Sequence, residues 1–116
     1  MEQKQIRLSP EVREAIVNAL ERCFPFKGAK AYLFGSRTNP RKRGGDVDIL
    51  IVIDEPKVLK NTLKTILDFE ACVIKKSDDQ KIDTKVISRA EFQEGKIPFI
   101  EVIKENLVEL WEYHDE

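Results

Sequence analysis

Long apolar runs are absent from this sequence, and so is any strong excess of charge. No stretch approaches the roughly 20 apolar residues that a membrane-spanning helix needs, and the N-terminal segment, MEQKQIRLSP, has no apolar signal core. We therefore expect a cytoplasmic protein without membrane contact. The 20 basic and 21 acidic residues give a net charge of -1, which provides no overall attraction to nucleic acid or to a membrane surface.

Cysteine and histidine are also scarce. The chain has two cysteines, Cys23 and Cys72, and one histidine, His114. The cysteines lack the spacing of a metal site and come without a secretory signal, so we expect buried free thiols. His114 lies in a polar tail, EYHDE, and we expect no histidine chemistry there. Neither a cysteine-based metal centre nor a disulfide framework is predicted.

The 116 residues do contain enough apolar side chains, 41% of the total, for one ordinary core, and we expect a single domain over residues 1–116. The uniformly apolar run at 47–53 indicates a strand that is covered on both faces and central in its sheet. The predicted class is α/β (α+β), a small mixed sheet flanked by helices. The patterns predict, in order, a helix from Pro10 to about Cys23, strands at 29–34 and 47–53, a long helix at 57–76, a strand at 81–88, short helices at 88–94 and 98–104, and at 107–111 either a continued helix or a terminal edge strand, which we favour.

The long predicted helix and the strand after it determine how the second half of the chain should pack. A right-handed crossover through this helix would make the strands at 47–53 and 81–88 parallel. Alternation in KIDTKVIS predicts that one face of the later strand carries Ile82, Thr84 and Val86, and the other carries Lys81, Asp83, Lys85 and Ile87. Helical spacing places the apolar positions of the helix toward one face of the sheet: Val58, Leu59, Leu63, Ile66, Leu67 and Val73.

Three aspartates are the candidate catalytic and metal-binding residues. Asp46 and Asp48 are two positions apart at the start of a strand, so their side chains project to the same side. Asp83 can join them if the two strands run parallel. Three carboxylates close together repel one another unless a cation lies among them. Oxygen-only ligands suit Mg²⁺ or Mn²⁺, and two such ions about 4 Å apart can stabilise an in-line displacement at phosphorus.

A glycine and a hydroxyl follow the strand at 29–34, at a position that suits phosphate binding. Gly35 allows the backbone to come close to a phosphate, and the hydroxyl of Ser36 and the exposed amides can bind its oxygens. Arg37 follows at once, and the segment RKR at 41–43 adds positive charge for a polyphosphate. We therefore expect Gly35, Ser36 and Arg37 to form a binding site for a phosphate or polyphosphate.

Together these pieces resemble the nucleotidyltransferase superfamily of DNA polymerase β. The resemblance rests on Gly35-Ser36 after a strand, a connecting loop, the segment GDVD at 45–48 before an apolar strand, and Asp83 on a later strand, and it covers residues 32–87. The short length is similar to the minimal nucleotidyltransferase branch, MNT, which includes antitoxins that pair with HEPN-domain proteins. The loop RTNPRKRGG departs from relatives that often place a small polar residue directly before the first acid.

The resemblance implies an activity and roles for the residues. It implies that Gly35 and Ser36 hold the triphosphate, that Asp46 and Asp48 bind two Mg²⁺ ions, and that Asp83 completes the catalytic metal site and helps to deprotonate a hydroxyl. The implied reaction moves a nucleoside monophosphate, AMP from ATP, to that hydroxyl with loss of pyrophosphate. In HEPN-paired members the acceptor hydroxyl is implied to belong to the partner protein.

Other interpretations of the same residues stay open. Asp46 and Asp48 could be turn formers, and Asp83 could pair with Lys81 or Lys85 as a surface ion cluster. The basic segment RKR fits a solvated loop better than a nucleic-acid reader, because no aromatic platform accompanies it. The chain could also be a non-catalytic antitoxin that neutralises its partner by contact alone, or could transfer to RNA or a small molecule. A helical HEPN-type partner or a second copy of the chain could supply the walls that so small a domain lacks.

Overall fold

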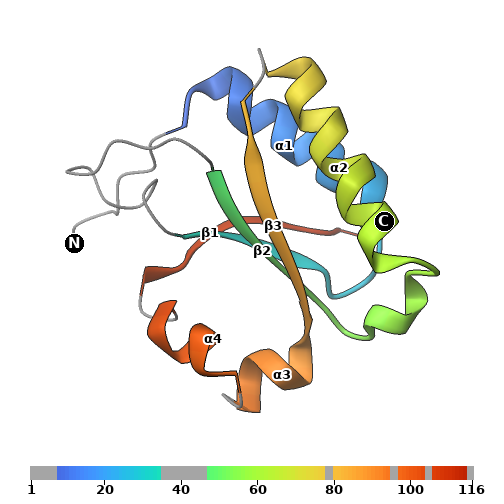
Figure 1. Ribbon diagram of the computed structural model, residues 1–116, viewed down its shortest axis with the longest axis vertical. Coiled ribbons are helices and arrows are strands. Elements are labelled where there is room, and N and C mark those ends of the chain that lie inside the picture. The colour runs from blue at the N-terminus through green and yellow to red at the C-terminus, as the bar shows by residue number, and fades with distance from the viewer. Residues whose placement is uncertain (1–7, 35–46, 78–79, 95–96, 104–105, 115–116) are drawn as a thin grey trace.

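The computed structural model describes residues 8–34, 47–77, 80–94, 97–103 and 106–114, and in this part of the chain a mixed sheet lies between two layers of helices (Figure 1). The predicted architecture is therefore confirmed. No helix of this part is long and apolar enough to cross a membrane. The elements are α1 (Pro10–Cys23), β1 (Lys30–Phe34), β2 (Val47–Ile53), the 3-10 turn η2 (Pro56–Val58), α2 (Thr62–Lys76), β3 (Ile82–Ser88), α3 (Arg89–Glu94), α4 (Pro98–Ile103) and β4 (Val108–Glu112).

The strands are ordered β3-β2-β1-β4 across the sheet. β2 pairs with β3 in parallel and with β1 in antiparallel orientation, and β4 pairs antiparallel with β1. The run at 47–53 is thus an interior strand, as predicted, and every residue in it except Asp48 is buried. The segment near the C-terminus forms the edge strand that we favoured over a continued helix.

The two faces of the sheet carry two separate apolar cores. α1 and α2 lie together over one face, and α3 and α4 lie toward the other (Figure 1). The first core, on the α1–α2 side, consists of the buried residues Ile16, Ala19, Leu20, Phe24, Ala29, Ala31, Leu33, Val47, Ile49, Ile51, Ile53, Leu59, Phe69, Val73, Ile82, Leu110 and Trp111. The second core consists of Phe34, Leu50, Val52 and Ile100, with Tyr32, Ile87, Phe92, Ile97 and Leu107 packed against it.

The helix expected at 57–76 begins later than predicted. Residues 56–58 form the separate turn η2, and α2 begins at Thr62. The reason is local, because the side chain of Asn61 accepts a hydrogen bond from the Lys64 amide at 3.1 Å and thereby caps the helix. α1 agrees with its prediction, since Ser9 caps it by accepting from the Val12 amide at 3.2 Å.

The apolar face predicted for this helix is wrong in part. Val58, Leu63 and Leu67 are exposed, and Leu63 keeps 66% of its surface in solvent. Val73, which belongs to the predicted face, and Phe69, which does not, are the helix residues buried in the first core. Phe69 and Val73 are four residues apart and share one side of the helix, whereas Leu63 and Leu67 share a different side that turns away from the sheet.

The expectation of buried thiols is also wrong in degree. Cys23 and Cys72 are free but only half-buried, one on α1 and one on α2, where both line a pocket on the surface between the two helices. Burial, followed by the neighbouring Cys72 with which it shares a hydrogen bond, raises the pKa of Cys23 above its ordinary value. The cysteines pack against the margin of the first core, and the charged residues Arg22, Asp68 and Lys75 line the same pocket.

Candidate active site

Two of the three predicted acids face each other across neighbouring strands. In the parallel pairing of β2 with β3, Asp48 is the register partner of Asp83. The amide of Val47 donates to the carbonyl of Lys81 at 3.0 Å, so the pairing continues to the start of both strands. Directly opposed residues on paired strands project to the same face of the sheet. Asp48 and Asp83 therefore form an acidic pair at the end of the sheet where both strands begin.

Alternation along the strands identifies the face on which this pair lies. On β2, the neighbours Val47 and Ile49 are buried in the first core, so Asp48 projects to the opposite face, the one that carries Leu50 in the second core. Asp48 is partly exposed while the rest of its strand is buried. The carboxylate thus belongs to a strand that is held rigidly by packing on both sides.

β3 shows the alternation expected from its sequence. Ile82 and Thr84 are buried on the side of the first core, whereas the side chain of Asp83 is 54% exposed on the other side. Oδ2 of Asp83 lies 3.6 Å from Nζ of Lys85, which is two residues further along the same face. The ion pair that was one alternative role for Asp83 is therefore present. An exposed pair of this kind stabilises a fold by only about 0–1 kcal/mol, so it leaves the carboxylate available to a stronger cation.

The remaining predicted site residues, Gly35, Ser36, Arg37 and Asp46, lie outside the described residues. Their neighbours in the chain, Phe34 and Val47, are described, and both lie at the same end of the sheet as the acidic pair, since Phe34 is the register partner of Asp48 in β1. Among the described residues, no group of three or more histidines, cysteines, aspartates or glutamates could hold a metal ion. The predicted triad of Asp46, Asp48 and Asp83 was outside this search as a group, because Asp46 lies outside the described residues.

The chemistry of the described donors suits a hard cation. Asp48 and Asp83 offer carboxylate oxygens only, the ligands that Mg²⁺ and Mn²⁺ prefer. The softer ligands lie elsewhere, because Cys23 and Cys72 belong to the helix layer on the opposite face. His114 follows β4 at the far end of the sheet, beyond the pairing of Glu112 with Lys30. A divalent cation that prefers oxygen therefore fits the acidic pair, and a zinc-type site does not.

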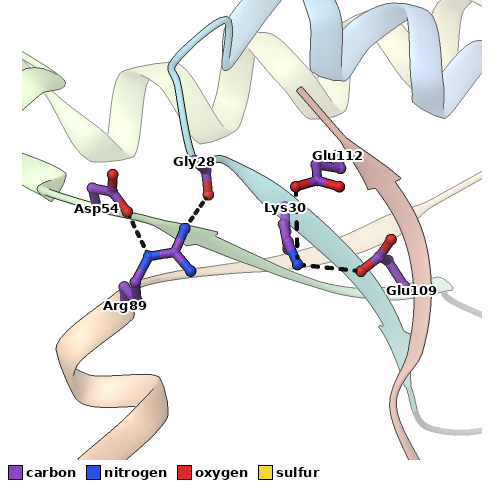
Figure 2. A network of polar contacts seen from close by, with 6 residues as sticks. All are labelled: Gly28, Lys30, Asp54, Arg89, Glu109 and Glu112. Atoms are coloured by element: carbon purple, nitrogen blue, oxygen red, sulfur yellow. Dashed lines mark hydrogen bonds and ion pairs between the residues drawn. The ribbon is translucent and has the colours of Figure 1, made fainter. Parts of the chain in front are cut away.

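A second group of polar contacts, which the sequence patterns did not reveal, joins segments at the opposite end of the sheet (Figure 2). Arg89, at the start of α3, donates from Nε to Oδ1 of Asp54 at 2.6 Å and from a terminal nitrogen to the carbonyl of Gly28 at 2.7 Å. Beside it, Lys30 lies 3.6 Å from Glu109 and 3.9 Å from Glu112. These contacts join segments far apart in the chain, and no periodicity could have indicated them.

These contacts lie away from the acidic pair. Asp54 follows the last residue of β2, whereas Asp48 is the second residue of that strand. Arg89 likewise follows the end of β3, whereas Asp83 is near its beginning. We therefore assign the Arg89 network to the stability of the fold and the acidic pair to the candidate site.

Comparison with known proteins identifies the family of this chain. The family model described as nucleotidyltransferase domain matches residues 13–112, from within α1 to the end of β4. A search of the curated proteins finds no match. Because the family match covers most of the chain, it identifies the class of the fold and the general activity, nucleotidyl transfer. The chain belongs to the nucleotidyltransferase domain family, within the polymerase β-like superfamily.

Proposed function

We propose that this protein transfers a nucleoside monophosphate from a nucleoside triphosphate, with ATP as the expected donor and Mg²⁺ as the expected metal, to a hydroxyl group. The observation that carries the proposal is the direct opposition of Asp48 and Asp83 at one end of the sheet. A pair of carboxylates held on rigid neighbouring strands suits a divalent cation and a polyphosphate. The family match supports nucleotidyl transfer in general.

The proposed roles divide the site residues into a metal-binding group and a phosphate-binding group. Asp46, Asp48 and Asp83 hold the metals, and Asp83 also accepts the proton of the attacking hydroxyl. Gly35, Ser36 and Arg37 hold the triphosphate. When bound, the divalent metals neutralise the phosphate oxygens and stabilise the attacking and leaving oxygens. In support of these roles, the chain enters and leaves residues 35–46 beside Asp48, at Phe34 and Val47.

The acceptor hydroxyl is proposed to belong to another protein, a helical partner of the HEPN type. The support is geometric, because the helices on the face of the acidic pair, α3 and α4, have only six residues each. Such short helices leave little wall for a base and an acceptor. A second copy of this chain is the other source of such a wall.

The proposal is tested with two acid variants and a matched control. We expect Asp48→Asn and Asp83→Asn each to lower the transfer of α-labelled AMP from ATP and Mg²⁺ to a co-purified partner by more than about 100-fold, since even residues that only support metal ligands contribute about 10- to 100-fold. Asp68→Asn removes an equally exposed carboxylate from α2, in the opposite helix layer, and should leave the transfer unchanged.

The outcomes separate an enzyme from a binding module. Transfer that persists in both acid variants would contradict the proposed site. No transfer by the wild-type chain, together with equal neutralisation of the partner by all four proteins, would favour an antitoxin that acts by contact alone. Intact mass spectrometry of the partner identifies a nucleotide-sized addition and the nucleotide base.

A further inference from the structure

Lys85 lies beside the acidic pair on the same face of the sheet. It follows Asp83 by two positions on β3, and its register partner on β2 is Leu50, two positions after Asp48. Its ammonium nitrogen is 3.6 Å from Oδ2 of Asp83. On this face the register pair Asp48–Asp83 is therefore followed by the register pair Leu50–Lys85.

The contact between Lys85 and Asp83 is weak enough to exchange for a metal ion. Both side chains remain about half exposed, 43% for Lys85 and 54% for Asp83, so water screens their attraction. A magnesium ion would carry twice the charge at about 2.0–2.1 Å from the carboxylate oxygen. The ammonium and a metal ion would therefore compete for Asp83, and the metal would prevail once its concentration is sufficient.

We propose that Lys85 competes with the divalent metal for the carboxylate of Asp83 and so sets the metal concentration at which the site fills. This inference rests on the proposed function, because it assumes that Asp48 and Asp83 are metal ligands. The stem of Lys85 emerges from a paired strand, so the released ammonium stays within a side-chain length of Asp83.

The test measures metal binding by the full chain without nucleotide. Mn²⁺ is the probe, and its free concentration is followed by electron paramagnetic resonance during titration. We expect Lys85→Met to tighten Mn²⁺ binding by about 1.5-fold to fivefold, the range that corresponds to one exposed ion pair. Lys85→Arg keeps both charge and reach and should bind Mn²⁺ as the wild type does. Lys85→Gln provides a second uncharged variant if the methionine variant does not fold.

A matched control separates direct competition from a general change in charge. Lys64→Met also removes an exposed lysine from an ion pair, the pair with Asp68 on α2, and should leave Mn²⁺ affinity unchanged. Equal or weaker Mn²⁺ binding by Lys85→Met, or the same tightening in Lys64→Met, would overturn the proposal. A purely structural role would lower thermal stability in Lys85→Met without tightening the metal.

The acid variants distinguish failure of this inference from failure of the proposed function. If Asp48→Asn and Asp83→Asn abolish Mn²⁺ binding while Lys85→Met leaves it unchanged, the metal site stands and the role of Lys85 is wrong. If the wild-type chain binds no Mn²⁺, or if binding survives in both acid variants, both proposals fall together.

Discussion

Gly28 has a backbone φ of +87°, in the region that side chains with a Cβ rarely adopt. A Cβ at this position would lie 2.7 Å from Oδ2 of Asp54, the carboxylate that also receives Arg89. The carbonyl of Gly28 accepts from the same guanidinium. A glycine is needed here both for the turn into β1 and for the close approach of a charged network.

We expect Gly28→Ala to lower the free energy of unfolding by about 2 kcal/mol or more, because φ strain and the collision with Asp54 add together. Urea denaturation followed by circular dichroism measures the change. In an Asp54→Ala background the collision is gone, so the same glycine substitution should cost only the φ strain, about 1–2 kcal/mol. An unchanged free energy in the single variant would show that the turn can rearrange.

Helix starts in this molecule follow from side chains that bind free amides. Asn61 caps α2 through the Lys64 amide, and Ser88 caps α3 by accepting from the Glu91 amide at 3.0 Å. Glu91 accepts in return from the Ser88 amide at 3.0 Å, which completes a capping box. These local contacts, together with the apolar side of each helix, determine where each element begins.

Asn61→Ala should lower the free energy of unfolding by about 1 kcal/mol, because one amide in the first turn of α2 loses its acceptor. Asn61→Asp is the matched control, since it keeps an acceptor oxygen at the same position and should stay within about 0.5 kcal/mol of the wild type. Thermal melts at one protein concentration provide the comparison. Equal losses in both variants would mean that the amide side chain has another structural role.

The whole molecule depends on a strand from the end of the chain. β4 pairs with β1, and its Leu110 and Trp111 are buried in the same first core that α1 and α2 cover. Lys30 adds ion pairs from β1 to two glutamates of β4. The edge strand should therefore unfold together with the rest of the sheet.

Trp111 is the only tryptophan in the sequence, so its fluorescence reports on β4 alone. We expect its denaturant transition to coincide with that of far-ultraviolet circular dichroism, because small domains with a shared core unfold cooperatively. A Trp111 transition at lower denaturant would show that β4 separates first. Lys30→Met provides a control: removing the exposed ion pairs should shift both transitions together by at most about 1 kcal/mol.

Much of the fold was predictable because its signals are local. The apolar run at 47–53 predicted a central strand, and the local pattern predicted that α1 begins at Pro10, since each depends on residues within one turn or one strand. The apolar face of α2 was predicted only in part, because a single sequence does not show which side of a helix meets the sheet. The pairing of Arg89 with Asp54, 35 residues apart, gave no local signal at all.

The candidate site divides in the same way. The sequence alone identified Asp48 and Asp83 as candidate site residues. It predicted that Asp83 joins Asp48 on one face because a right-handed crossover makes their strands parallel. Only the tertiary structure decided that Asp48 lies directly opposite Asp83. The physical reason is that register is set by backbone hydrogen bonds between distant strands together with the packing of both cores, and no short stretch of sequence contains both partners.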